Sequence, residues 1–340
     1  MMQELSPTAG HDIAYAHGRI AVLQQLLLSR SEVDRLLGAH DAQEVAKIFI
    51  ELRFTSRIDQ GIADPDMLLL ALARWVREEV LSMAPPKSMH AFDVLWLEGD
   101  IPLLAYLLKK KIGLTSAISQ EPAPAFTSYS PEAWKDLIEH ERGWDDHHPP
   151  SASKVVAEAL ALQDPTPAAI DTIAAEWGAG EQLLAAKRSG SRNILRYVRH
   201  SIDLKNIRTA LRSLDRSKEE RQALLVTGGT IPVKSLLGSR ADIAHAVEMA
   251  DLGFGVAVEI RKEEVDIQRL EQSLSSVTAA DIADMWNVPL SPEPLFAFAA
   301  LAFTQITLLR TILLVKRAGF SPQQTKRVLP PFLPATHYVL

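Results

Sequence analysis

The residue types best suited to metal chemistry stand together in one short run, Asp145-Asp146-His147-His148, which two prolines follow. Aspartate and histidine side chains are ligands for Zn²⁺ and similar ions. Adjacent residues of a loop rarely converge on one ion, however, and no second cluster of such ligands occurs in the sequence. We therefore interpret the run as a solvated loop and expect no metal site.

A second candidate for chemistry is the run Thr227-Gly-Gly-Thr230, because glycine-rich loops cradle phosphates. It lacks the Lys-Ser/Thr pair of a P-loop and the glycine spacing of a dinucleotide site. The sequence also contains no Gly-x-Ser-x-Gly, no His-Glu-x-x-His and no cysteine, so it offers neither these catalytic motifs nor thiolate chemistry. We expect a turn here, no catalytic residue, no bound cofactor and hence no enzyme.

The most informative charge pattern lies in residues 187–221, where eleven lysines and arginines stand against four acids in a chain of net charge −6. Five of these arginines recur at helical spacing on two faces, Arg192, Arg196 and Arg199 on one and Arg208 and Arg212 on the other. A solvated helix face is the plain interpretation, and a docking surface for an acidic protein is the functional one. Nucleic acid is disfavoured, because Tyr197 is the segment's only aromatic residue. We predict the five arginines to form a partner interface.

Three polar residues indicate the helices that position these groups. They are Asp100, Asp203 and Gln305, with 103 residues from the first to the second and 102 from the second to the third. Each is followed by apolar residues one, four and eight positions later, which is the stripe of one helix face. Polar groups inside an apolar helix need partners and often fix register rather than react. Together with Asn206 and Arg310, the three residues are predicted to be structural repeat positions.

This period predicts three similar helical modules, residues 1–115, 116–220 and 221–340, in one continuous body. The chain is predicted to be all-α, because strand alternation is nearly absent and only residues 223–233 are a weak candidate for a hairpin.

Helix boundaries are marked by capping residues. Asp64 and Ser321 precede proline, and Ser31, Asp41 and Thr278 each precede an acid by three residues. These patterns are typical of helix N-termini. Gly178 is predicted to end a helix.

Composition agrees with a folded, cytoplasmic protein. The apolar fraction is 47%, enough for a substantial core, and the N-terminus has no basic stretch followed by an apolar one. Residues 295–315 are long and apolar enough to cross a bilayer. They include Arg310, however, and a central arginine costs about 2.5–3.5 kcal/mol in a membrane. We predict a buried helix, with a membrane span as the alternative.

Four places in the chain resemble one protein family. Tyr15-Ala-His-Gly-Arg-Ile20 looks like an opening helix of the family, and residues 203–212 are similar to its Asp-x-x-Asn-Ile-Lys/Arg motif. Gly228-Gly229 falls where the family has a glycine turn, and Leu270-Glu271 is similar to the start of a late helix. The family comprises the C subunits of the archaeal and bacterial V/A-type ATPases, whose counterpart in the vacuolar enzyme is the d subunit. In the last repeat the family's Lys-Glu-Glu-Asn polar set is missing here, although Arg310 is kept.

The resemblance implies an all-helical funnel of three modules that catalyses nothing and binds no nucleotide. It implies a place on the cytoplasmic face of the membrane, between the central shaft and the rotor ring of a rotary ATPase. Ion transport would be coupled to ATP turnover through this link, with peripheral membrane contact through the ring, no nucleic acid and no homo-oligomer. Two alternatives stay open from the residues alone: a helical-repeat scaffold that binds proteins, and a nucleic-acid-binding helical protein.

Overall fold

The computed structural model describes residues 13–59, 61–114, 127–140, 150–329 and 332–333. Every regular element in these ranges is a helix, so the all-α prediction is confirmed. The chain forms two compact units: unit 1 combines Met1–Ala91 with Asp266–Leu340, and unit 2 is Phe92–Val265. The three predicted modules have other boundaries and stay a prediction.

Unit 1 consists of helices from both ends of the chain. They are α1 (Ile13–Leu23), α2 (Arg30–Gly38), α3 (Ala42–Glu51), α4 (Pro65–Met83), α13 (Ile267–Trp286), α14 (Glu293–Arg317) and α15 (Pro322–Val328). Short 3-10 turns, Gln24–Leu26, Arg53–Thr55 and Pro86–Ser88, connect the N-terminal helices.

The helix starts of unit 1 follow local capping chemistry. Asp41 accepts a hydrogen bond from the backbone N–H of Glu44, and Ser321 caps α15 ahead of Pro322, both as predicted. Ser321 also forms a full capping box with Gln324. The cap of α2 is Ser29 rather than Ser31, because Glu32 completes a capping box with Ser29. Thr278 caps nothing, since it lies in the middle of α13, and its acid three residues later is buried inside the same helix.

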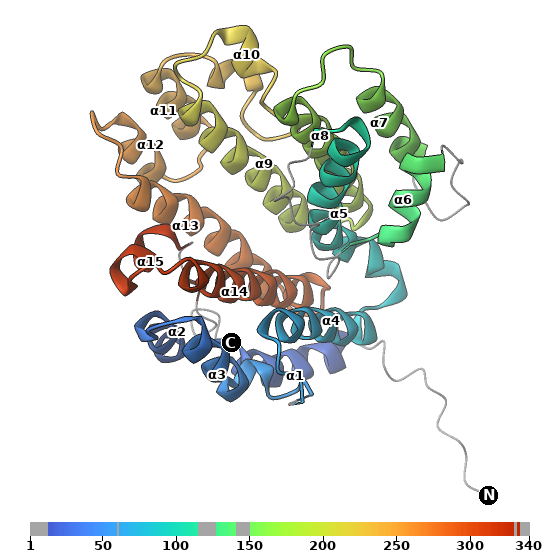
Figure 1. The fold of residues 1–340 in the computed structure, drawn as a ribbon, viewed down its shortest axis with the longest axis vertical. Coiled ribbons are helices and arrows are strands. Elements are labelled where there is room, and N and C mark those ends of the chain that lie inside the picture. The colour runs from blue at the N-terminus through green and yellow to red at the C-terminus, as the bar shows by residue number, and fades with distance from the viewer. Residues whose placement is uncertain (1–12, 60, 115–126, 141–149, 330–331, 334–340) are drawn as a thin grey trace, which may run out of the picture. The chain divides into compact units, whose positions relative to one another are not determined.

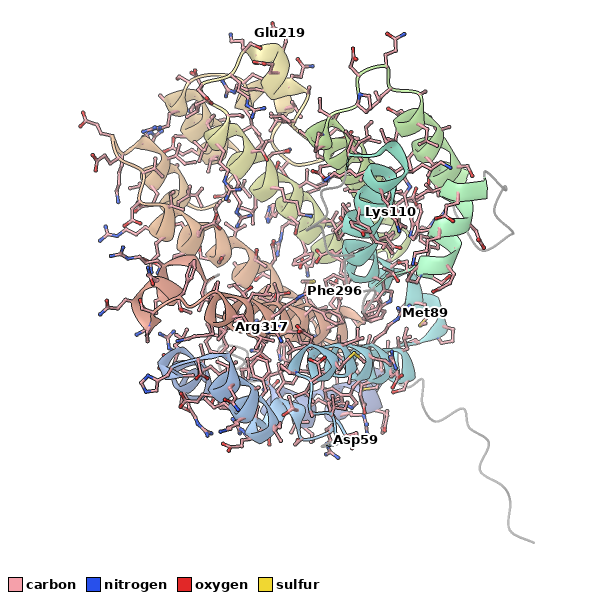
Figure 2. The ribbon with its side chains drawn as sticks, in the orientation of Figure 1. Asp59, Met89, Lys110, Glu219, Phe296 and Arg317 are labelled. Atoms are coloured by element: carbon pink, nitrogen blue, oxygen red, sulfur yellow. The ribbon has the colours of Figure 1, made fainter. Side chains whose placement is uncertain are left out.

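The core of unit 1 is organised around α14, which packs against α1, α3, α4 and α13. Figure 1 shows α14 between α13 and α4. Its first turns are almost wholly apolar, and Phe296, labelled in Figure 2, and Phe298 are both fully buried. Length and composition alone would let Glu293–Arg317 span a membrane. Its burial among the other helices agrees with the predicted core helix.

Unit 2 holds most of α5 (Met89–Ile112) and the helices that follow it. They are α6 (Pro131–His140), α7 (Pro150–Leu160), α8 (Pro167–Arg188), α9 (Arg192–Arg212), α10 (Lys218–Gln222), α11 (Arg240–Met249) and α12 (Phe254–Arg261), with a 3-10 turn at Val233–Leu236. Neighbours in sequence pack together, α7 with α8, α8 with α9, and α11 with α12 (Figure 1).

Two tryptophans form the centre of one core cluster in unit 2. Trp134 and Trp177 meet edge to face with ring centroids 5.1 Å apart. Gly178 beside them does not end a helix, contrary to the sequence prediction, because α8 runs on to Arg188. A Cβ at this glycine would lie 2.2 Å from a side-chain carbon of Ile101. The glycine therefore allows close packing of α8 on α5 rather than a helix stop.

Candidate docking surface and polar anchors of helix α9

The buried side of α9 carries a carboxylate that accepts hydrogen bonds from the backbone of a later loop. Asp203 is 0% exposed and accepts hydrogen bonds from the N–H of Thr230 at 2.7 Å and of Ile231 at 3.0 Å. Burial raises the pKa of Asp203, while these two N–H donors oppose the rise. The carboxylate thus fixes the loop after α10 onto α9.

Asn206, one turn further along α9, anchors the same loop. Its amide donates to the carbonyl of Val226 at 2.7 Å, and its oxygen accepts from the N–H of Val226 at 2.9 Å. A side-chain amide therefore matches the backbone of one residue with both of its hydrogen-bonding groups.

The glycine pair explains how closely the loop approaches the helix. Gly228 has a φ of +106°, and a Cβ at Gly229 would lie 2.1 Å from Oδ1 of Asp203. Residues 223–233 form no strand, so the hairpin expectation is wrong, because the loop pairs with α9 side chains instead of with itself. The run Thr227-Gly-Gly-Thr230 is a turn, as predicted, and the N–H groups of Thr230 and Ile231 are already used by Asp203.

Asp100 makes the corresponding contacts in α5. Its carboxylate accepts from the N–H of Ser128 at 2.6 Å, of Tyr129 at 3.3 Å and from Nε1 of Trp134 at 2.7 Å. The sequence separations of 28 and 29 residues resemble the 27 and 28 of the Asp203 contacts. Both aspartates therefore hold a segment that follows at almost the same distance along the chain.

Gln305 in α14 is the third predicted repeat position, and its hydrogen bonds differ from those of Asp100 and Asp203. Its Oε1 accepts from the N–H of Leu28 at 2.8 Å, and its Nε2 donates to the carbonyl of Leu333, 28 residues on, at 3.0 Å. Arg310 is exposed and, within the described ranges, takes part in no hydrogen bond or ion pair. The threefold repeat itself stays a prediction, but its three polar positions all tie a distant backbone segment to a helix.

The five predicted interface arginines all lie on α9, at graded exposure. Arg192, Arg199 and Arg212 are exposed and, in the described part of the chain, have no hydrogen bond or ion pair. Arg196 and Arg208 are half-buried and interact with other residues of the chain.

These arginines form two groups rather than one surface. With 3.6 residues per turn, Arg199 and Arg208 point about 180° apart around the helix axis. The first group, Arg192, Arg196 and Arg199, begins at the N-terminus of α9, and the second, Arg208 and Arg212, lies at its C-terminal end. A single flat partner can therefore contact one group at a time.

The helix dipole of α9 favours the arginines at its C-terminal end and disfavours those at its N-terminal end. Arginines in the last turn complement the negative C-terminal end, whereas Arg192 sits at the positive end of α9, whose first turn has no acid. Local helix chemistry thus accounts for Arg212 and not for Arg192. The first group lies next to Lys187 and Arg188, the exposed cations that close α8.

The sequence groups Arg221 with the basic residues of the 187–221 segment, which suggests an exposed side chain. The structure shows instead that Arg221 is buried. It is only 4% exposed and donates to the carbonyls of Leu236, Leu237 and Gly238 at 2.7–3.0 Å. It fastens the turn before α11. No local pattern marks this role, because its partners lie 15 to 17 residues later.

Within the ranges that the structure covers, no group of three or more His, Asp or Glu side chains could hold a metal ion. The run Asp145-Asp146-His147-His148 lies outside the described residues.

Asp100, Asp203 and Gln305, on α5, α9 and α14, thus hold backbone segments in place in a helical protein. Its sequence matches the model of the ATP synthase (C/AC39) subunit family over residues 16–328. The chain belongs to this family, which confirms the resemblance found in the sequence and makes it a member of the V/A-type rotary ATPase subunits. Ion transport and a rotary motor follow from that membership, as does association with other subunits of the complex at a membrane. No curated protein matches the chain.

Proposed function

We propose that this chain is the non-catalytic central-stalk subunit that links the rotating shaft to the membrane rotor ring. In this role it couples ATP turnover to proton or sodium transport from the cytoplasmic face of the membrane. The observation that carries the proposal is the family match, which extends over residues 16–328 and so over both compact units.

A linking protein has to transmit torque without deforming, and the buried anchors suit that demand. Asp100, Asp203 and Gln305 each tie a distant segment to a helix through backbone groups. Close-packed interiors of this kind have low compressibility. A twist applied at one side of a unit is therefore passed on rather than absorbed.

The first arginine group of α9 is the part of the predicted interface that best suits an acidic partner. Arg192 and Arg199 are exposed, while Arg192 opposes the helix dipole without an acid to offset it. An acidic surface of a neighbouring subunit would supply the missing charge and orient the encounter. The second group already complements the helix dipole at the C-terminal end of α9, so it is the weaker candidate for a partner interface.

Affinity purification from membranes of the native host in mild detergent tests the stalk role directly. Recovery of the catalytic subunits, the shaft and the rotor ring with this chain is the expected result. Recovery of soluble proteins alone would contradict the stalk role and favour a helical scaffold.

Charge reversal tests the docking surface separately. Arg192→Glu with Arg199→Glu should weaken assembly at least tenfold at physiological salt while leaving the helical circular dichroism unchanged. The matched control is Lys326→Glu with Arg327→Glu, the same charge change at two exposed positions of α15. Equal assembly of both variants would remove the arginine group from the interface and leave the stalk role standing.

A further inference from the structure

Helix α14 of unit 1 has one line of residues in its second half that the rest of the chain does not bury. Its members are Phe303, Thr307, Arg310 and Leu314, of which the first is half-buried and the other three are exposed. They follow one another at intervals of four, three and four residues, so they lie on one face of the helix. The line is about 16 Å long. We call it the α14 seam.

The spacing of the α14 seam is that of a coiled-coil contact. Side chains at alternating intervals of three and four residues form a seam, and each inserts between four residues of a facing helix. In the described part of the chain, α1, α3, α4, α13 and α15 pack on α14 and leave this seam uncovered. The seam therefore has the geometry to accept one more helix.

The threonines next to the seam offer methyl groups rather than hydroxyl groups to a partner. Thr304 and Thr311 donate their hydroxyls back to the carbonyls of Ala300 at 2.9 Å and Thr307 at 2.8 Å. These hydroxyl protons are thus already used within the helix. Leu314, which is 49% exposed, adds a large apolar group. Such a surface gains free energy when another apolar surface covers it.

Arg310 supplies the single charge of the seam. It is the only ionisable residue between Glu293 and Lys316. It is exposed and, within the described ranges, has no hydrogen bond or ion pair. The helix dipole does not account for it, because it lies about two turns before Arg317, where α14 ends. An arginine among apolar groups is typical of a binding hot spot, where the exclusion of water strengthens its attraction to a carboxylate.

We infer that the α14 seam docks a helix of another subunit of the complex, and that this helix carries a carboxylate opposite Arg310. One charged pair in an apolar seam would fix which residues face each other, as a single polar residue does in coiled coils. Acyl chains of a lipid would cover the apolar groups but leave the guanidinium without an opposite charge. The choice of a subunit as the partner rests on the proposed function.

Site-directed photo-crosslinking identifies what covers the seam, and the absence of cysteine from the sequence makes an introduced thiol unique. The full chain with Thr307→Cys is labelled with a benzophenone maleimide and added to ATPase complex from a host that lacks this subunit. The expected adduct lies on a helix of another subunit, with an aspartate or glutamate about one turn from the crosslinked residue. Adducts on a second copy of the chain, on lipid or within the chain itself would overturn the inference, as would assembly without an adduct.

Charge reversal measures what Arg310 contributes. Arg310→Glu should weaken binding of the chain to the same complex about tenfold, because it replaces a close charge pair by a repulsion. The matched control is Arg327→Glu, at another exposed arginine of unit 1 that lies outside the seam, and it should keep its affinity. Replacing the partner's carboxylate by lysine should restore the binding of Arg310→Glu. Equal affinity of Arg310→Glu and the control would overturn the inference.

Leu314→Ser tests the apolar part of the seam. It should weaken binding about fivefold, since the variant loses a side chain that the partner covers. Its control is Met67→Ser, because Met67 is 53% exposed on α4 and lies outside the seam. Circular dichroism checks that each variant is folded.

The same binding assay separates this inference from the proposed function. If the wild-type chain assembles with the complex and both seam variants bind as their controls do, the seam is not an interface and the stalk role stands. If the wild-type chain does not assemble, the stalk role is wrong, and the partner inferred for the seam is wrong with it.

Discussion

Asp203 in unit 2 and Gln305 in unit 1 are two of the predicted repeat positions, and they make different sets of hydrogen bonds. Asp203 faces two N–H groups of one loop, and a carboxylate is suited to this because it only accepts hydrogen bonds. Gln305 faces an N–H at Leu28 and a carbonyl at Leu333, so it must both accept and donate.

The difference shows that each side chain matches the hydrogen-bonding groups that surround it. A charged residue there would point at a carbonyl oxygen, whereas the neutral amide ties together two segments from opposite ends of the chain. The uncharged Gln305 therefore anchors backbone segments, as the charged Asp203 does. Substitutions that replace the amide by a carboxylate, or the carboxylate by an amide, should therefore lower the free energy of unfolding.

The largest effect is expected for Gln305→Glu. The new carboxylate would be buried at a site with 1% exposure and could no longer donate to the carbonyl of Leu333. An uncompensated buried charge costs about 3–5 kcal/mol of unfolding free energy. Denaturant unfolding at neutral pH measures it. Because a protonated glutamic acid can donate, the loss should shrink as the pH falls.

Thr307→Glu is the control for that substitution, since Thr307 is exposed on the same helix. Its effect should stay within about 0.5 kcal/mol. If both variants unfold at the same denaturant concentration, the bridge between Leu28 and Leu333 contributes nothing.

Asp203→Asn is expected to cost somewhat less. The amide can turn only its oxygen toward the loop, so its NH₂ group meets one of the two N–H donors, Thr230 or Ile231. An unsatisfied buried donor of this kind costs about 1–3 kcal/mol of unfolding free energy. Urea unfolding at pH 7 measures the loss, and an unchanged midpoint would contradict the anchoring role.

The pH dependence of the Asp203 contribution has a definite sign. Burial raises the pKa of Asp203 above its ordinary 3.8, so the folded state holds this proton more tightly than the unfolded state. Its contribution to stability is therefore fully present below pH 3.8 and falls as the pH rises through the folded pKa. The stability gap between wild type and Asp203→Asn should be wider in mild acid than at pH 7.

Gly229→Ala should destabilise by about 1.5 kcal/mol, because the methyl group must push Asp203 away from the loop. In Gly180→Ala, its control within α8, the new Cβ meets no atom within 4 Å. That change should stabilise by about 0.5–1 kcal/mol. In an Asp203→Ala background the cost of Gly229→Ala should fall, and an unchanged cost would mean that the clash lies elsewhere.

The smallest effect is expected for Arg310→Ala. Arg310 is exposed and, within the described ranges, has no polar partner. The free energy of unfolding should therefore change by less than about 0.5 kcal/mol. A larger loss in thermal unfolding would show that Arg310 is a structural position of unit 1 after all.

Local patterns in the sequence are sufficient for the helices and for several of their ends. Asp41 and Asp64 cap helices where their spacing predicts it, because capping depends on the next three residues alone. The importance of Asp203 and Asn206 is also predictable, since polar groups in an apolar stripe require partners. The partners of these two residues cannot be predicted in the same way, because they lie 20 to 28 residues later in the chain.

Long-range contacts are the reason for the errors. Gly178 follows the pattern of a helix stop, yet it makes room for Ile101 on another helix. Arg221 has the sequence context of a surface cation, but the carbonyls that hold it belong to a later turn. The opposite orientation of the two arginine groups follows from helix geometry alone and is visible in their spacing.

The split composition of unit 1 also dictates an order of events during synthesis. Unit 2 is one uninterrupted stretch, Phe92–Val265, and can fold as soon as it has left the ribosome. Helices α1, α3 and α4 pack on α14, and α2 packs on α15, so these N-terminal helices depend on segments that are made after unit 2. The N-terminal helices therefore wait, with their apolar faces uncovered, until α14 and α15 have been made. A premature stop after Val265 would leave a folded unit 2 attached to an N-terminal segment without a core, which is a natural target for chaperones and proteases.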